Sequence, residues 1–236
     1  MEDKKELRFS GKLGTEYELL TQACPHYFNF QNAVTESVKR DENESFTALE
    51  VGTGPGETTE IFANRFKHAK IICVDNETDM IKQAKINLKK FGDRIKINHS
   101  DALEFVKSLD SNSIDVFFSG FTLHNFDKLF RKEFLSELFR VLKSGGQFIN
   151  GDKYALDDLK ERYKAFNSTV QQYLDSYLPN DRDDLCYDWI VHVGEDENSK
   201  KLMIESESIK DMKSIGFKKM KITFREQMEA VLFAEK

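Results

Sequence analysis

A glycine-rich segment early in the chain has the residue types of a ligand-binding loop. It reads LEVGTGPGETT over residues 49–59, so a predicted strand leads into Gly52, Gly54 and Gly56 and then into a predicted helix. Glycines let the backbone turn sharply and approach a ligand closely, and the start of the following helix offers unpaired N–H groups. The segment therefore predicts a binding site for a small polar ligand. A tight turn that serves only packing is the alternative.

Acidic residues around this loop favour a cationic ligand. The dinucleotide fingerprint requires G-x-G-x-x-G, whereas this loop is G-x-G-x-G and continues with Glu57, whose carboxylate would repel a pyrophosphate. Glu50, at the end of the predicted strand, adds a second carboxylate. Two carboxylates suit a sulfonium amino acid that also carries an ammonium group. S-adenosylmethionine therefore fits the loop better than NAD does.

Two further predicted strands end in acidic residues. IICVD ends at Asp75, close to the spacing of about 20 residues at which an acidic side chain accepts hydrogen bonds from ribose. We expect Asn76 to bind the ribose edge and Met80 to cover one face of an adenine. The segment NHSDALEF places Asp101 at the next strand end, where it accepts either from an adenine amine or, as a helix N-cap, from backbone amides. The carboxyl ends of parallel strands form the ligand-binding edge of open α/β sheets.

Short apolar runs alternate with longer segments of helical periodicity, which is the pattern of β-α-β units around a parallel sheet. Strands are predicted over residues 46–52, 70–75, 95–99, 114–119 and 147–151, and helices over 57–66, 77–91, 102–109 and 128–142. Gly145-Gly146 is expected to end the last of these helices. A helix over 205–215 and two strand-like runs, FKKMKITF and EAVLFAE, close the chain and indicate an antiparallel hairpin at the sheet edge.

Two segments lie outside this alternation. Residues 1–45 predict an N-terminal helical segment or lid, with one or two amphipathic helices interrupted at Pro25. The rest, 46–236, predicts one main domain with a cap inserted at about 153–200. An apolar stripe within the cap indicates a long helix that stops before Pro179, and the polar stretch 181–200 is expected to be an irregular loop or lid.

Composition limits the class of protein. The 236 residues fit one large domain with a small cap, and a formal charge of −6 disfavours a general nucleic-acid binder. No apolar run is long enough for a membrane span and the first residues are charged, so a cytoplasmic protein is expected. The three cysteines, Cys24, Cys73 and Cys186, form no C-x-x-C pair, and the five histidines show no H-x-x-x-H spacing. The sequence therefore predicts no disulfide framework and no metal site.

In the order and content of its motifs, the chain from about Tyr27 to Lys236 resembles the class I S-adenosylmethionine-dependent methyltransferases. The matching segments are LEVGTGPGETT, CVDNETDMIKQAK, NHSDALEF, IDVFFSGFTLHNF and VLKSGGQFINGD. Within the class it is most similar to small-molecule methyltransferases and the related carboxy-S-adenosylmethionine synthases. The resemblance implies a Rossmann-like, doubly wound, mostly parallel seven-stranded sheet with an antiparallel C-terminal hairpin and a helical cap. It also implies in-line transfer of a methyl group from S-adenosylmethionine to a small molecule, with S-adenosylhomocysteine as product.

The resemblance also implies which residues hold the ligands. The methionine part of the cofactor would lie among Glu50, Gly52, Thr53, Gly54 and Gly56, and ribose and adenine among Asp75, Asn76, Met80, Asp101 and Ala102. Ser119 and Gly120 would hold the amino acid end. The acceptor pocket would be built from Tyr17, Tyr27, Phe28, Phe121, His124, Asn125, Tyr154, Tyr163 and Phe166. His26 either lines the mouth of this pocket or is an ordinary helix residue.

Methyl transfer from a sulfonium needs alignment first and a base only when the nucleophile carries a proton. His124 is the leading candidate for that base, because it follows the fourth predicted strand and imidazole titrates near neutral pH. The alternative is that it packs against or orients Asn125.

Two readings other than methyl transfer stay open. Carboxy-S-adenosylmethionine synthases bind the added carboxylate with an arginine that precedes the last helix, and this chain has no arginine between Arg182 and Arg225, although Arg182, Lys200 or Lys201 could substitute. A non-catalytic cofactor-binding protein is the other reading. The apolar stripe of the cap helix fits a homodimer surface as well as it fits a core.

Overall fold

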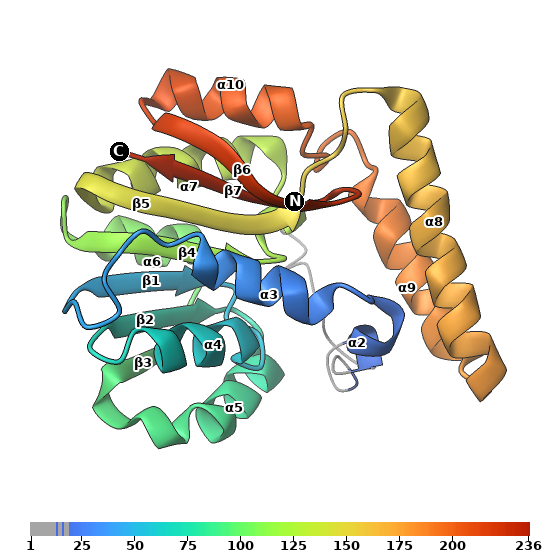
Figure 1. Cartoon of the computed structure of the whole chain (residues 1–236), viewed down its shortest axis with the longest axis horizontal. Coiled ribbons are helices and arrows are strands. Elements are labelled where there is room, and N and C mark those ends of the chain that lie inside the picture. The colour runs from blue at the N-terminus through green and yellow to red at the C-terminus, as the bar shows by residue number, and fades with distance from the viewer. Residues whose placement is uncertain (1–12, 14–15, 17–18) are drawn as a thin grey trace, which may run out of the picture.

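The structure, a computed structural model, describes residues 13, 16 and 19–236 (Figure 1). One sheet contains the strands β1 Thr47–Val51, β2 Lys70–Asp75, β3 Ile95–His99, β4 Ile114–Gly120, β5 Leu142–Lys153, β6 Lys218–Glu226 and β7 Glu229–Glu235. Their order is β3-β2-β1-β4-β5-β7-β6. The pairs among β1 to β5 are parallel, and β7 runs antiparallel to both β5 and β6. The predicted sheet and its C-terminal hairpin are confirmed.

Helices cover both faces of this sheet, as Figure 1 shows. The α-helices are α2 Leu20–Ala23, α3 Tyr27–Glu36, α4 Glu57–Arg65, α5 Thr78–Asn87, α6 Ala102–Ser108, α7 Lys128–Val141, α8 Leu159–Tyr177, α9 Asp183–Asp196 and α10 Glu205–Ile215. Short 3-10 helices are η2 Lys89–Arg94, η3 Leu123–Asn125 and η4 Leu178–Asn180. Helices α3 and α4 share one core with the sheet, and α6, α7 and α10 share the other. None of the described helices combines the length and apolar character that crossing a bilayer requires.

Adjacent phenylalanines on β4 show why the two cores form. Side chains of neighbouring strand residues point to opposite faces, so Phe117 packs against Phe134 of α7 and Phe118 stacks on Phe62 of α4. The rings of Phe118 and Phe62 are nearly parallel, with centroids 4.1 Å apart. The strand is therefore fixed from both sides, and the loop that follows it is held at a defined place.

The C-terminal end of α7 differs from the prediction. The helix ends at Val141, and β5 begins at Leu142 and includes Gly145 and Gly146, which were expected to stop the helix. Gly145 has a φ of +73°, and its amide donates to the carbonyl of Lys236 at 3.2 Å. The two glycines therefore belong to a bend in the strand that meets the last residue of the chain.

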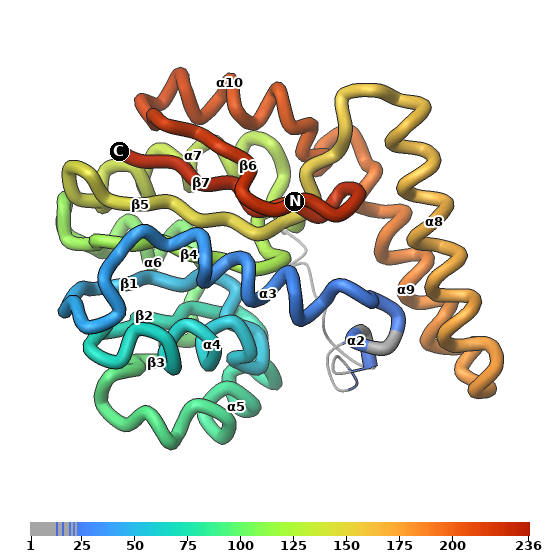
Figure 2. Tube along the Cα trace, in the orientation of Figure 1, coloured from blue at the N-terminus to red at the C-terminus, as the bar shows by residue number. Residues whose placement is uncertain are grey.

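The segment expected to be irregular at 181–200 contains helix α9, which lies beside α8 at one side of the sheet (Figures 1 and 2). Leu185, Trp189 and Val193 lie four residues apart and are all buried. They form a small core with Tyr173 of α8 and Ala23 of α2. The prediction of an irregular loop was wrong because the charged residues at both ends make the segment polar on average, so its apolar stripe was not recognised.

Candidate active site

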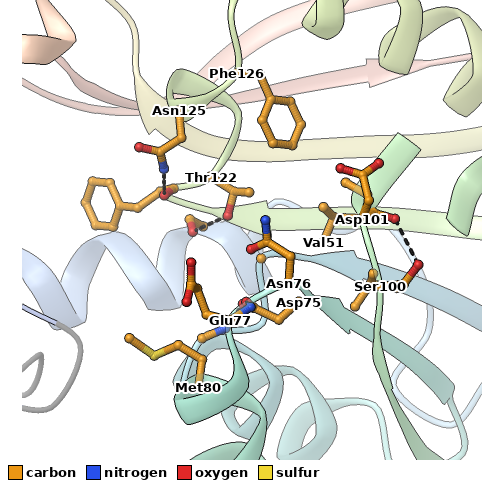
Figure 3. Close-up of a pocket in the computed structure, with 16 residues that line it drawn as sticks. Val51, Asp75, Asn76, Glu77, Met80, Ser100, Asp101, Thr122, Asn125 and Phe126 are labelled. Carbon is orange, nitrogen blue, oxygen red and sulfur yellow. Dashed lines mark hydrogen bonds between the residues drawn. The ribbon is translucent and has the colours of Figure 1, made fainter. Parts of the chain in front are cut away.

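A cavity of about 170 Å³ opens where the carboxyl ends of β1 to β4 meet (Figure 3). It lies beside β1 and β4, which are neighbours in the sheet. The strands that follow β1 in the chain, β2 and β3, lie on one side of this pair, and those that follow β4 lie on the other. Ligands of open α/β sheets usually bind at such a point. We call it the first cavity. Its lining residues are Val51, Gly52, Gly54, Val74, Asp75, Asn76, Glu77, Met80, Ser100, Asp101, Ala102, Gly120, Phe121, Thr122, Asn125 and Phe126.

Hydrogen bonds to the end of β2 hold the glycine loop. The amides of Gly52 and Thr53 donate to the Val74 carbonyl at 2.8 and 3.3 Å, and the Gly54 amide donates to Oδ2 of Asp75 at 2.8 Å. Gly54 has a φ of +55°, and a Cβ built on it would meet nothing within 4 Å. Because Gly54 lines the first cavity, a ligand can approach the backbone closely there.

The other two glycines of the loop allow close packing. A Cβ on Gly52 would lie 2.0 Å from Oγ1 of Thr122, in the loop after β4, and one on Gly56 would lie 2.9 Å from the Leu88 side chain. Gly52 still lines the first cavity, whereas Gly56 does not. Gly56 therefore fits a helix-packing role rather than the expected ligand contact.

Asp75 joins the glycine loop to the turn before α5. Its Oδ1 accepts from the amide of Glu77 and its Oδ2 from the amide of Gly54, each at 2.8 Å. Burial raises the pKa of this carboxyl above its ordinary value, although these hydrogen bonds oppose the shift. Asn76 and Met80 lie beside it on the cavity wall (Figure 3). The structure therefore groups the residues expected to hold ribose and adenine.

Asp101 caps α6 and lines the first cavity. Its Oδ1 accepts from the amides of Leu103 and Glu104 at 2.8 and 3.0 Å, which is the N-cap arrangement that the sequence left open. Ala102 follows on the cavity wall. Both expectations for Asp101 are compatible with this position.

Glu50 lies away from the first cavity, contrary to expectation. The residue is 1% exposed, and its carboxyl accepts hydrogen bonds from the hydroxyl of Thr59 on α4 and the thiol of Cys73. Burial raises the pKa of Glu50 to about 8, although the hydrogen bonds from Thr59 and Cys73 oppose the shift. Its carboxyl faces α4 and β2, and Glu50 does not line the first cavity. Thr53 and Ser119 are also absent from the lining, and Ser119 instead donates to the carbonyl of Val51 at 2.8 Å.

A second, smaller cavity of about 40 Å³ lies between the loop after β4 and the cap helices. Phe121 lines both cavities, so they are neighbours. His124 lines the second cavity with 5% of its side chain exposed. The complete lining is Ala23, Cys24, Phe121, His124, Lys153, Thr169, Gln172, Tyr173, Trp189, His192 and Glu229.

Asp152, at the end of β5, orients the His124 ring. Its Oδ1 lies 2.6 Å from Nδ1 of His124, and its Oδ2 accepts from the amide of Leu123 at 2.8 Å. Burial alone would raise the pKa of Asp152, but the His124 ring and the donated hydrogen bonds lower it below its ordinary value. A carboxylate accepts only, so Nδ1 of His124 carries a hydrogen, and in the neutral imidazole Nε2 presents its lone pair. Nε2 is buried, and none of the described residues forms a hydrogen bond with it.

Titratable side chains that the sequence did not lead us to expect lie around this histidine. Nζ of Lys153 lies 2.6 Å from Oδ2 of Asp196, and the thiol of Cys24 lies 3.5 Å from Oε1 of Glu229. Burial raises the pKa of both Cys24 and Glu229. One signal was available, because His192 and Asp196 are spaced one helical turn apart.

Among the residues expected to form the acceptor pocket, those in the loop after β4 line the two cavities. Phe121 lines both cavities and Asn125 the first. Tyr27 is buried, stacks on Phe121 with ring centroids 6.3 Å apart and donates a hydrogen bond to Glu57. Phe166 packs in the core of the cap.

The other expected pocket residues lie elsewhere. Phe28 and Tyr163 are 63% and 57% exposed, because each lies on the outer face of its helix. His26 is near the surface, with Nε2 3.4 Å from Oε1 of Glu226. Tyr154 is buried beside a separate cavity that Met212 of α10 lines. Tyr17 is outside the described residues.

Comparisons with known proteins match this architecture. Residues 48–146 match a family model described as a methyltransferase domain. Carboxy-S-adenosyl-L-methionine synthase from Nautilia profundicola is 22% identical over 95% of each chain. Demethylmenaquinone methyltransferase from Leptospira interrogans is 29% identical over 52% of this chain and 49% of that protein. A Methanococcus maripaludis structure, described as an S-adenosyl-L-methionine-dependent methyltransferase, has a TM-score of 0.63 at 18% identity and covers 100% of this chain and 96% of that one.

The matched domain runs from β1 into β5 and so contains all the lining residues of the first cavity named above. The match to a methyltransferase domain agrees with the expectation of S-adenosylmethionine rather than NAD as cofactor. Residues 48–146 of the chain therefore form a methyltransferase domain, and the whole chain shares its fold with an S-adenosyl-L-methionine-dependent methyltransferase structure.

Proposed function

We propose that this enzyme transfers the methyl group of S-adenosylmethionine, bound in the first cavity, to a small molecule bound in the second. The observation that carries the proposal is the loop after β4. Phe121 of this loop lines both cavities, Asn125 lines the first and His124 the second. One short segment therefore joins a cofactor site to a buried histidine, as in-line transfer between neighbouring ligands requires.

The residues of the first cavity fit the cofactor. Open space beside Gly54 admits a ligand against the backbone, and Asp75 and Asn76 offer acceptors to ribose hydroxyls. Met80 and Ala102 supply apolar contact for an adenine ring, and Asp101 retains an oxygen beyond the one that caps α6. Bound S-adenosylmethionine supplies a methyl group that its sulfonium sulfur activates for displacement. The chain's task is to orient the two reactants and to exclude water.

His124 acts as the base in this proposal. Asp152 holds Nδ1–H, so the lone pair of Nε2 is available to take a proton from the acceptor as the new bond forms. The ionised carboxylate of Asp152 also stabilises the imidazolium that results. The acceptor is then a proton-bearing nucleophile small enough to lie among Phe121, Tyr173 and Trp189.

The test compares His124→Gln with a matched control, His68→Gln, which changes an exposed histidine outside both cavities. Production of S-adenosylhomocysteine is followed with a panel of small phenols, amines, thiols and carbon acids. We expect His124→Gln to lower turnover by about 100-fold or more. The affinity for S-adenosylhomocysteine and the turnover of the control should stay within about twofold of the parent. Full turnover in His124→Gln would refute the base, and no turnover with any acceptor would refute the proposed substrate class.

Synthesis of a carboxylated cofactor is the second candidate, because a relative with that name aligns along 95% of this chain. The arginines on either side of the expected position are engaged elsewhere: Arg182 pairs with Glu16 and Asp184, and Arg225 pairs with Glu205. Neither arginine lines the first or second cavity. Mass spectrometry of ligand released from the denatured purified protein separates the two functions. S-adenosylmethionine or S-adenosylhomocysteine would support methyl transfer, and a carboxylated derivative would overturn it.

A further inference from the structure

Three buried side chains converge between the loop after β4 and helix α9. They are His124, His192 and Asp196, whose ligand-capable atoms all lie within 4.8 Å of one another. Their exposed fractions are 4%, 5% and 8%. Two imidazole nitrogens and one carboxylate oxygen are a donor set that suits zinc and its transition-metal neighbours, whereas magnesium and calcium prefer oxygen ligands alone.

His124 already has the orientation of a metal ligand. Its Nδ1 lies 2.6 Å from Oδ1 of Asp152, and its buried Nε2 has no hydrogen-bond partner within the described part of the chain. Histidines that bind metals almost always donate their other ring N–H to a carboxylate, a carbonyl or water, which fixes the tautomer and the ring. In His124 this hydrogen bond from the other ring nitrogen is already made, to the carboxylate of Asp152.

We propose that His124, His192 and Asp196 form a binding site for a zinc-class divalent ion, and that an ion bound there stops methyl transfer. The inhibition rests on the proposed function, because the ion would occupy the same Nε2 lone pair that serves as base. Nε2 of His124 and Oδ2 of Asp196 are 3.9 Å apart. Tetrahedral zinc with bonds of about 2.0 Å places its donors about 3.3 Å apart, so a small movement brings this pair into range, and His192 must also approach from within 4.8 Å.

The ammonium group of Lys153 would compete with this ion for the carboxylate of Asp196. Its Nζ lies 2.6 Å from Oδ2 of Asp196, the same oxygen that faces His124. The ammonium group compensates the carboxylate charge and would repel a divalent ion, so the ion must displace it. The Lys153 side chain is 19% exposed, and its four-carbon stem can move toward solvent. Removal of its charge should therefore tighten ion binding, whereas removal of a ligand should weaken it.

Trp189 provides the signal for the test. It is the chain's only tryptophan, and its ring contacts that of His192 edge to face with centroids 5.3 Å apart. The probe is Co²⁺, which quenches tryptophan fluorescence, added to the full-length protein after chelator treatment, and Zn²⁺ is then titrated in competition and by calorimetry. We expect one ion per chain, displacement of Co²⁺ by Zn²⁺, and no quenching by Mg²⁺.

Variants with opposite expected effects on the Kd for Co²⁺ make the test specific. Lys153→Met should lower the Kd for Co²⁺ by about tenfold or more, and His192→Ala and the isosteric Asp196→Asn should raise it by at least as much. His26→Ala, which removes a histidine near the surface, is the matched control and should leave the Kd unchanged. Thermal melts establish that each variant is folded.

Several results would overturn the proposal. Ion binding that Asp196→Asn leaves unchanged would show adventitious binding elsewhere, and no binding to either the parent or Lys153→Met would remove the site. Zn²⁺ that binds without lowering turnover would overturn the inhibition. Calorimetry with S-adenosylhomocysteine on the metal-free protein tests the proposed function separately, so failure of that function would not be mistaken for failure of the metal site.

Discussion

Replacement of Asp75 with asparagine should weaken cofactor binding while leaving the fold intact. The carboxylate accepts one hydrogen bond on each oxygen, from the amides of Gly54 and Glu77, and lines the first cavity. Asparagine has almost the same size, but its NH₂ group cannot accept. Whichever way the amide is turned, one backbone N–H then faces a donor, and the cofactor's ribose hydroxyls lose a charged acceptor.

The structure sets the size of the effect. A hydrogen bond to a charged group contributes about 1.5–3 kcal/mol, and the loss of one such bond to the cofactor corresponds to an increase in Kd of about 10- to 150-fold. Either the glycine loop at Gly54 or the turn at Glu77 also loses its hydrogen bond to residue 75, which adds to the loss of affinity. A modest fall in melting temperature should accompany the change.

The assay is calorimetric titration of S-adenosylhomocysteine into the parent, Asp75→Asn and Asp79→Asn. Asp79 is an exposed acidic residue on α5 that pairs with Lys82 and lies outside the first cavity, so its replacement should leave the Kd unchanged. Circular dichroism and thermal melts establish that all three proteins are folded. A folded Asp75→Asn protein that binds as tightly as the parent would refute the assignment of Asp75 to the cofactor.

Three further predictions concern the loop, a buried acid and the cap. Gly54→Ala should lower the affinity for S-adenosylhomocysteine in calorimetry, because its methyl group enters the open space of the first cavity, whereas Gly56→Ala should mainly lower the melting temperature, because it meets Leu88. Glu50 has a folded pKa of about 8 against an ordinary 4.5, so the folded parent retains a proton that the unfolded chain releases, and its stability falls as pH rises between these values. The melting temperature of Glu50→Gln minus that of the parent should therefore increase between pH 4.5 and about pH 8 and stay constant above pH 8. A difference that does not change with pH would contradict the raised pKa of Glu50. Leu185→Ala should cost about 2–5 kcal/mol of stability in denaturant unfolding, since its side chain is fully buried in the cap core, and an unchanged midpoint would show that the cap contributes nothing to the measured stability.

Local patterns were sufficient for the sheet and for much of the first cavity. The alternation of apolar runs with helical periodicity fixes β-α-β units, and the carboxyl ends of their strands must meet at one edge. Gly52, Gly54, Asp75 and Asp101 each follow such a strand, so their positions in the chain already placed them together. Glu50 was misplaced because its side chain points away from the cavity toward α4, a direction that its position beside the loop did not reveal.

The sequence by itself determined the α/β fold, the glycine loop and the acidic strand ends, because each depends on residues close together in the chain. Only the tertiary structure decided the second cavity. His124 and Asp152 come from different strand ends, and His192 and Asp196 come from a helix that the sequence did not reveal. Their convergence depends on how the cap packs against the sheet, which arises from contacts between segments distant in sequence and leaves no short-range pattern.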